Sequence, residues 1–232
     1  MDKKLSPNCV KCLTVSCSPP IGSTKKPSFD KAPASCPVKM MPTIMNEALA
    51  EYEKPAIKEF ARQASIQEFE CYENTPEGRR TKNPRIVEVI QFAHKMSYKK
   101  LGLAFCAGLA NEARTLTEIL ENNGFEVISS RCKMGGVPKE KIGIKNEEKI
   151  GGPNSCETMC NPIAQAKSLN SEKVDLGIML GLCVGHDTLF FKYCEVPVTV
   201  IAVKDRVTGH NPLAALYLAN SYYARLKGKK AE

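Results

Sequence analysis

The sequence predicts an α/β protein with an open, mostly parallel sheet of about four or more strands and helices on both faces. Its strongest support is an alternation of strand-length apolar runs with helical segments over residues 99–232. Strands that alternate with helices build parallel sheets that are covered on both faces. The composition, 43% hydrophobic and 25% charged, supports a sizeable buried core and excludes an intrinsically disordered chain.

Residues 1–42 form a separate block ahead of that core. They contain four cysteines and seven prolines, but no apolar periodicity long enough to bury a face. A segment of this kind becomes ordered only when something external binds it. We therefore divide the chain into a cysteine-rich metal-binding segment, 1–42, and an α/β domain, 43–232.

The domain begins with a helical lead-in over residues 43–98. Thr43 is expected to cap a first helix whose apolar residues recur at helical spacing. A second helix is predicted at 57–69, followed by a loop over 73–83. Pro84 then stands at a first-turn position, where proline is favoured, and opens a third helix.

The remainder of the domain, residues 99–232, alternates between strands and helices. The predicted strands cover 99–106, 125–131, 176–182 and 198–203, and the predicted helices cover 111–122, 162–169, 188–193 and 212–226. The stretch 133–155 is rich in Gly and Lys and shows no period. We find no long internal repeat.

Cysteine is the most informative residue type in the chain. Eleven of the 232 residues are cysteines, against three histidines. The N-terminus lacks the apolar core of a secretory signal, and the longest apolar runs fall short of the roughly 20 residues of a membrane span. We therefore expect a cytoplasmic protein without membrane association. In a reducing compartment, many cysteines indicate metal, cluster or thiol chemistry.

Three of the four predicted strands end in cysteine, at Cys106, Cys132 and Cys183. Ligands of open parallel sheets bind beyond the carboxyl ends of the strands. Neighbouring strands lie about 5 Å apart, so the three thiols would converge if their strands are adjacent. The alternative is that each cysteine is simply a small buried apolar side chain. The presence of cysteine at the ends of three strands argues against this alternative.

A fourth cysteine, Cys160, precedes a predicted helix start at Asn161 and Pro162. Asn is a favoured N-cap and Pro a favoured first helical residue, and the N-terminus of a helix stabilises a nearby thiolate. His210 precedes the same Asn-Pro pair at 211–212. In the simpler interpretation both motifs only cap their helices, and the two preceding residues are incidental.

These four cysteines, Cys106, Cys132, Cys160 and Cys183, would suit a [4Fe–4S] cluster or tetrahedral zinc. Three of them with an open position would suit a catalytic centre. The candidate catalytic residues beside them are His186, Asp187, Lys204, Asp205, Arg206 and His210. The histidines would donate protons, and Lys204 and Arg206 would hold an anionic substrate. Equally, Asp187 could cap the next helix, and 204–206 could be a surface charge run.

The N-terminal cysteines have the spacing C-x2-C-x4-C-x18-C, at Cys9, Cys12, Cys17 and Cys36. A C-x2-C pair with two further cysteines, in a segment that lacks a core, is typical of a metal site. Metal binding would supply the folding free energy that the segment lacks. Three interpretations stay open: structural zinc, an iron–sulfur cluster, and unligated thiols on an unstructured tail.

Other features carry less information. The formal charge of +8 fits an anionic partner, but the basic residues are scattered, so we expect a solvated surface and no nucleic acid. The glycines near the strand ends match neither a dinucleotide-binding fingerprint nor a P-loop. Cys71, Cys156 and Cys194 follow no predicted strand and are interpreted as structural or spectator thiols.

Five strings carry a resemblance to a known family. They are GLAFCAGLANEA (102–113), GFEVISSRCK (124–133), MCNPIAQAKSLN (159–170), GLCVGHDTLFFKY (181–193) and VTVIAVKDRVTGHNPLAALY (198–217). With the N-terminal cysteines, they resemble a prokaryotic family, the domain of unknown function family numbered 1847, often labelled metal-binding protein. The resemblance implies metal binding through cysteines at both sets and carries no reaction with it. The six candidate catalytic residues match the family pattern, whereas Cys71, Cys156 and Cys194 do not.

The sequence therefore predicts a metal- or iron–sulfur-binding protein that carries out redox or sulfur chemistry at the carboxyl edge of its sheet. Its substrate would be small and anionic or thiol-reactive, and an electron-transfer partner would fit a redox role. The alternative is a non-catalytic module that senses or carries a metal or a small anion, with structural zinc in the N-terminal segment.

Overall fold

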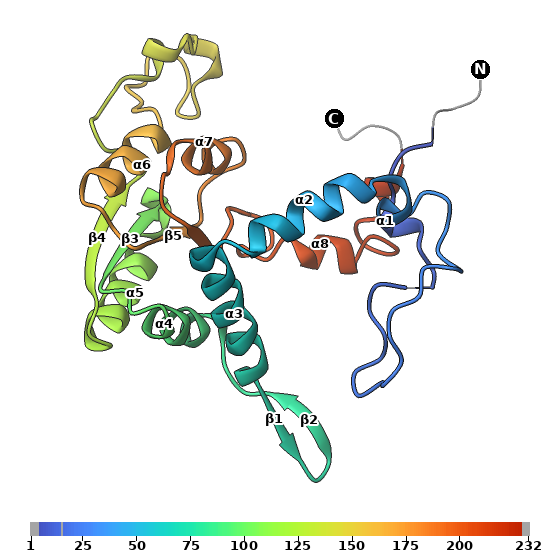
Figure 1. Ribbon diagram of the computed structural model, residues 1–232. Coiled ribbons are helices and arrows are strands. Elements are labelled where there is room, and N and C mark those ends of the chain that lie inside the picture. Colours follow the sequence, from blue (N-terminus) through green and yellow to red (C-terminus); the bar gives the residue numbers. More distant parts are fainter. Residues whose placement is uncertain (1–4, 15, 229–232) are drawn as a thin grey trace. The chain divides into compact units, whose positions relative to one another are not determined.

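The computed structural model describes residues 5–14 and 16–228. It divides the chain into two compact units, one up to Ile66 and one from Gln67 onward, and each is described by itself. Figure 1 gives the order of the elements along the chain.

The first unit combines an irregular stretch with helices. Its elements are the 3-10 turn η1 (Cys9–Lys11), α1 (Pro37–Met40), α2 (Pro42–Tyr52) and the greater part of α3 (Pro55–Glu70). The two helices predicted after residue 42 are confirmed. However, α2 begins at Pro42, so Thr43 lies inside the first turn and is not the cap. Among the described residues up to Ile66, only Ala32, Ser35 and Cys36 are buried.

The second unit is built around a four-stranded parallel sheet. Its strands are β3 (Lys100–Phe105), β4 (Glu126–Arg131), β5 (Leu176–Leu180) and β6 (Val198–Ala202), in the spatial order β4-β3-β5-β6. All three pairings are parallel. The four predicted strands and the parallel sheet are therefore confirmed.

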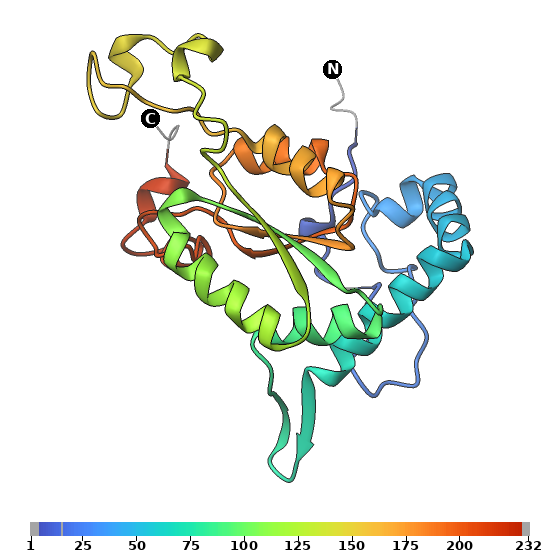
Figure 2. The same cartoon turned by 90° about the vertical axis from the view of Figure 1, so that its left-hand side faces the viewer.

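Helices cover both faces of this sheet, as predicted (Figure 2). On one face, α4 (Arg85–Lys95) and α5 (Ala110–Asn122) pack on side chains of β3 and β5. On the other face, α6 (Pro162–Ser171) and α7 (His186–Tyr193) do the same. Successive strand residues point to opposite faces, and every residue of β5 is buried, as expected for a central parallel strand.

Residues 73–83, predicted as a loop, contain an antiparallel hairpin of β1 (Tyr72–Thr75) and β2 (Gly78–Thr81). The prediction failed because these strands are polar and show no apolar alternation. Polar contacts stabilise the hairpin instead: the Thr75 hydroxyl donates to the Gly78 carbonyl, and Arg80 pairs with Glu73 across the strands at 2.6 Å.

The helix predicted over 212–226 is also wrong in extent. The chain forms only α8 (Leu213–Tyr217) and the 3-10 turn η5 (Ala224–Lys227), with turns between them. Asn220 and Ser221 lie in the interruption, and both residue types favour turns over helix interiors. The N-cap of α8 is Pro212, so Asn211 does not take the capping position that the sequence suggested.

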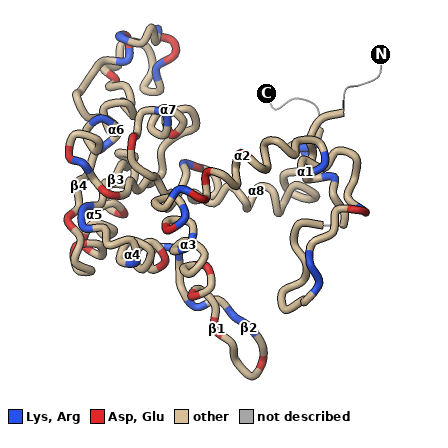
Figure 3. Tube along the Cα trace, in the orientation of Figure 1, with Lys and Arg blue, Asp and Glu red and all other residues tan. Residues whose placement is uncertain are grey.

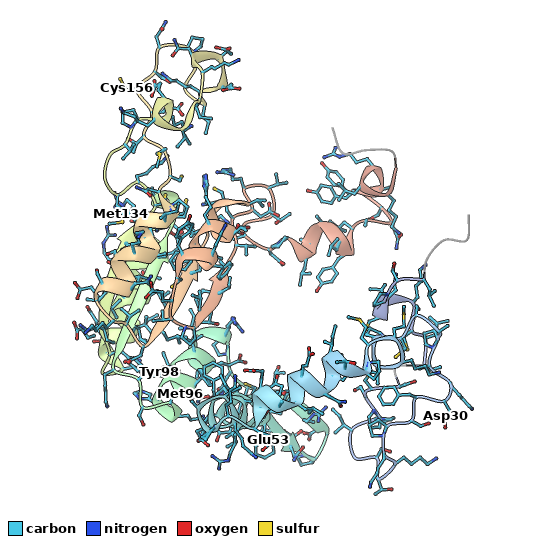
Figure 4. The ribbon with its side chains drawn as sticks, turned by 45° about the horizontal axis from the view of Figure 1, so that its top comes forward. Asp30, Glu53, Met96, Tyr98, Met134 and Cys156 are labelled. Carbon is cyan, nitrogen blue, oxygen red and sulfur yellow. The ribbon has the colours of Figure 1, made fainter. Side chains whose placement is uncertain are left out.

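The aperiodic stretch after β4 forms a segment with two 3-10 turns, η3 (Lys139–Ile142) and η4 (Asn146–Glu148). Figure 4 shows Met134 near the sheet and Cys156 farther out on this segment. Two ion pairs hold it together: the buried Lys149 ammonium contacts Glu140, and Lys139 contacts Glu157. Side-chain pairs thus replace an apolar core here.

Basic and acidic residues are interspersed along the elements of the second unit, in agreement with the predicted scatter of charge (Figure 3). Within the part of the chain that the structure describes, no helix has both the length and the apolar character needed to cross a membrane.

Candidate functional site

The three strand-end cysteines of the second unit follow three adjacent strands. Cys106 comes directly after β3 and Cys132 directly after β4, while Cys183 follows β5 by three residues. The strand pairing continues into the first two, because the Cys106 amide donates to the Leu180 carbonyl and the Cys132 amide to the Phe105 carbonyl. The adjacency on which their convergence depends is therefore present.

Gly181 gives the chain its turn after β5. Its φ of +70° lies in the left-handed region, and a Cβ there would come within 2.1 Å of the Leu109 side chain. Only glycine therefore lets the turn that carries Cys183 lie against the turn that follows Cys106.

Cys160 is brought to Cys132 by the start of α6. The Asn161 amide donates to the Cys132 carbonyl at 2.7 Å. The Asn161 side chain accepts from the Ala164 amide at 3.0 Å, and Pro162 is the first helical residue, so the predicted cap is confirmed. On its other side, the Cys132 sulfur accepts from the Ala107 amide at 3.2 Å. Cys132 thus links the start of α6 to the turn after β3.

The two thiols have opposite protonation preferences. A hydrogen bond from Cys132, followed by the positive charges of His186 and Lys133, lowers the pKa of Cys160 to about 5. The same hydrogen bond, together with burial, raises the pKa of Cys132 far above its ordinary value. One proton therefore serves the pair, with the negative charge on Cys160 and the proton on Cys132.

Cationic side chains lie along the same edge. Arg206 donates to the Cys183 sulfur at 3.3 Å. This contact, with the negative potential of Cys183, Cys106 and Cys160, raises the pKa of Arg206. Lys204 follows β6, and its amide donates to the Leu182 carbonyl. A Cβ placed on Gly108 would lie 3.8 Å from the Lys204 ammonium and 3.9 Å from the Cys106 sulfur, so both groups border one space.

Asp205 and His210, predicted as catalytic, close a loop. The Asp205 carboxylate accepts from the amides of Val207 and Thr208, and the Asp205 amide donates to His210 Nδ1 at 3.0 Å. The hydrogen bonds to Thr208 lower the pKa of Asp205. The suggested likeness between His210 and Cys160 fails, because α8 is only five residues long and Asn211 does not cap it.

His186 and Asp187 begin α7, whose N-cap is Gly185. Their amides both donate to the Cys183 carbonyl, so they continue the turn that carries this cysteine. Asp187 accepts from the Thr188 amide inside the first turn and is not the cap of the helix. His186 lies close enough to Cys160 to lower the pKa of that thiol.

In the N-terminal set, one backbone contact brings two cysteine-bearing segments together. The Asn8 amide donates to the Ser35 carbonyl at 2.9 Å, directly before Cys9 and Cys36. Cys36 is buried, whereas Cys9 and Cys17 are exposed. Across residues 5–14 and 16–228, no three His, Cys, Asp or Glu side chains are grouped closely enough to hold a metal ion. Metal binding at either set of cysteines remains a prediction.

The three cysteines interpreted as spectators are scattered. Cys71 is buried and donates to the Gln67 carbonyl at 3.0 Å. Cys194 caps the C-terminus of α7, and Cys156 is exposed on the segment after β4. None of these three thiols directly follows a strand of the four-stranded sheet.

Sequence reasoning missed Gln165. This residue of α6 is fully buried, and its amide nitrogen donates to the carbonyls of Ser130 at 2.6 Å and Phe105 at 3.3 Å. It therefore ties together the ends of β4 and β3, next to Cys132 and Cys106. The sequence feature that could have identified Gln165 is its position as a polar residue on the apolar face of a predicted helix, between Pro162 and Ala166.

A family model described as "Protein of unknown function (DUF1847)" matches residues 36–201. The chain belongs to the DUF1847 family. The matched range includes Cys36 and all four sheet-edge cysteines, while Cys9, Cys12, Cys17 and residues 204–210 lie outside it.

A relative from Methanocaldococcus jannaschii is 47% identical over 150 residues, which are 64% of this chain and 74% of that protein. It is itself described as an uncharacterized protein. The DUF1847 relationship thus identifies the family of the chain and supplies no reaction.

Proposed function

We propose that this DUF1847 protein binds a metal ion or an iron–sulfur cluster at the carboxyl edge of its sheet and uses it in redox or sulfur chemistry. One observation carries the proposal: three adjacent parallel strands are each followed by a cysteine. A fourth cysteine, Cys160, lies beside them, because the amide of the next residue, Asn161, donates a hydrogen bond to the Cys132 carbonyl. The ligands would be Cys106, Cys132, Cys160 and Cys183.

The chemistry of the donor set fits such a centre. Cysteine thiolates are the ligands of iron–sulfur clusters and of many zinc sites. Two of the four sulfurs already accept N–H hydrogen bonds, Cys132 from the Ala107 amide and Cys183 from Arg206. Hydrogen bonds of this kind tune metal–thiolate centres. A bound cluster would supply one-electron transfer, and bound zinc would supply a Lewis acid.

The charged residues at this edge supply the remaining functions. Lys204 and Arg206 would bind an anionic substrate, and His186 would donate a proton. Lys133, whose ammonium donates to the Thr158 carbonyl, stabilises the thiolate of Cys160. An electron-transfer partner would complete a redox cycle at this edge.

We assign the N-terminal cysteines to a second centre, an electron relay or structural zinc. The contact between Asn8 and Ser35 supports this assignment, because it joins the C-x2-C turn to Cys36. The small number of buried residues supports it too, since a bound metal would replace the missing core.

A non-catalytic metal- or anion-binding module is the second candidate. One observation favours it: Asp205 and His210 are hydrogen-bonded within their own loop, which gives both residues a structural role there. The two candidates differ in the optical spectrum, because zinc is silent and an iron–sulfur cluster absorbs visible light.

The test is metal and acid-labile sulfide analysis, with a visible spectrum, on the full chain purified without oxygen. We expect about four iron and four sulfide for a cluster of the [4Fe–4S] type. Cys183→Ser should remove the sheet-edge centre and leave the N-terminal metal. Cys156→Ser is the matched control and should change neither. An unchanged metal content in Cys183→Ser would overturn the assignment, and colourless protein with zinc alone would favour the binding module.

A further inference from the structure

We propose that Lys204 and Arg206 bind a small sulfur oxyanion in the space beside Gly108, against Cys106 and Cys183. The oxyanion part of this inference rests on the positions of the cations and of Gly108. The identification of sulfur rests on the proposed function, which assigns sulfur chemistry to these cysteines.

Within the described part of the chain, the Lys204 ammonium lacks a counter-charge at the sheet edge. Among the described residues, neither Lys204 nor Arg206 forms an ion pair with a carboxylate. Arg206 donates to the Cys183 sulfur, whereas the Lys204 ammonium donates no hydrogen bond to a described residue. The carboxylate between them, Asp205, is bound to the amides of Val207 and Thr208. Lys204 is half-buried. A partly buried ammonium without a counter-charge is unfavourable, so an anion at this point would stabilise it.

Gly108 leaves a space between the Lys204 ammonium and the Cys106 sulfur. Its φ does not lie in the left-handed region, so the backbone does not require glycine at this position. A Cβ would lie 3.8 Å from the Lys204 ammonium and 3.9 Å from the Cys106 sulfur, which is ordinary van der Waals contact. An alanine would therefore fit the fold but would fill the space between the ammonium and the thiol.

The groups around this space determine the class of ligand. Lysine and arginine together recognise oxyanions, arginine through its planar fork and lysine as a point charge. Arg206 is also bonded to the Cys183 sulfur, which places a bound oxyanion next to a thiol. An oxyanion that contacts the Lys204 ammonium beside Gly108 would lie next to the Cys106 sulfur. A sulfur oxyanion with a terminal sulfur matches this arrangement.

The test compares thiosulfate with sulfate, two dianions of similar shape that differ by one sulfur in place of one oxygen. Binding is measured by titration calorimetry on the full-length protein as purified without oxygen. We expect thiosulfate to bind at least about tenfold more tightly than sulfate. Lys204→Met should weaken thiosulfate binding by at least about tenfold, the usual loss for a charged hydrogen bond. Gly108→Ala should weaken it as well, because the added methyl group would occupy the space between the ammonium and the Cys106 sulfur.

Lys192→Met is the matched control, because it removes one exposed positive charge from α7, and it should leave binding unchanged. Equal binding of the two dianions, no binding of thiosulfate, or unchanged binding in Lys204→Met and Gly108→Ala would each overturn the inference. Thermal unfolding verifies that the variants fold. Metal and sulfide content of the same samples tests the proposed function separately, since the wild-type protein could lack a metal centre and still bind thiosulfate.

Discussion

The two sets of cysteines in this chain lie in opposite structural settings. The sheet-edge cysteines follow strands of a sheet that helices cover on both faces. Backbone groups of Cys106, Cys132 and Cys183 are hydrogen-bonded to neighbouring strands and turns. The N-terminal cysteines lie in a unit of which only Ala32, Ser35 and Cys36 are buried among the residues that the structure describes. In the first setting the fold positions the thiols before any ligand binds. In the second setting, a bound ligand would have to order the segment that carries the thiols.

The difference has an energetic meaning. Where a core already exists, a bound metal adds its free energy to a unit that is stable without it. Where a core is missing, the free energy of metal binding is itself the free energy of folding. The same type of ligand is therefore expected to have opposite consequences for structure in the two places.

Metal removal should show the largest difference between the two units. After chelation, we expect proteolytic sites within residues 5–42 to become fully accessible, because structural zinc contributes about 10–16 kcal/mol in small metal-bound segments. The α/β unit should keep its circular dichroism and its cooperative unfolding. Limited proteolysis with mass spectrometry, before and after chelation, measures this. Unchanged cleavage within 5–42 would show that no metal orders the segment.

The reactivity of Cys160 is the second way to separate the two sets. Because a hydrogen bond from Cys132 lowers the pKa of Cys160 to about 5, its thiolate is populated above that pH and lost below it. In metal-free protein, alkylation of Cys160 by iodoacetamide should therefore level off near pH 6. Cys132→Ala should move the midpoint up toward the value of about 8.5 for an ordinary thiol. The rates are followed by mass spectrometry of the Cys160 peptide.

A wild-type rate that still rises steeply through pH 8 would contradict this assignment of the charge. So would a midpoint that is the same in Cys132→Ala, because the Cys132 hydrogen bond is the largest cause of the lowered pKa. The N-terminal cysteines provide the internal comparison in each sample.

Features of the fold and the candidate site could be predicted from the sequence where they depend on residues close together in the chain. The four strands and the cap at Asn161 could be predicted, because apolar runs and an Asn-Pro pair act locally. Gln165 could not, because its partners, Phe105 and Ser130, lie 60 and 35 residues away. Its polar side chain is stabilised only by carbonyls that the folded sheet brings to it.

The errors in the predicted fold have a related cause. The strands β1 and β2 do not alternate apolar and polar residues, so the apolar runs that identified the buried strands gave no prediction of this hairpin. The second Asn-Pro pair, at 211–212, resembles the first but leads to a helix of only five residues. A local motif predicts a cap only where the following residues sustain the helix, and Asn220 and Ser221 do not.

A core substitution should affect the second unit and spare the first. Phe190 of α7 is fully buried and belongs to the apolar cluster that also contains Ala104 and Cys132. Phe190→Ala should lower the free energy of unfolding of this unit by about 3–5 kcal/mol, the usual result of such a cavity. Urea unfolding followed by circular dichroism measures it. The exposed neighbour Phe191 supplies the control, and an equal loss in Phe191→Ala would contradict the burial argument.

The smallest expected effect distinguishes the two Asn-Pro pairs. Asn161→Ala removes the acceptor for the Ala164 amide and should lower the free energy of unfolding by about 1 kcal/mol. Asn211→Ala is the matched control, because no side chain caps α8, and it should cause no measurable loss. Urea unfolding of both variants under identical conditions gives the comparison. No loss in Asn161→Ala would mean that the cap adds nothing to the start of α6, and an equal loss in Asn211→Ala would mean that the loss does not come from the cap.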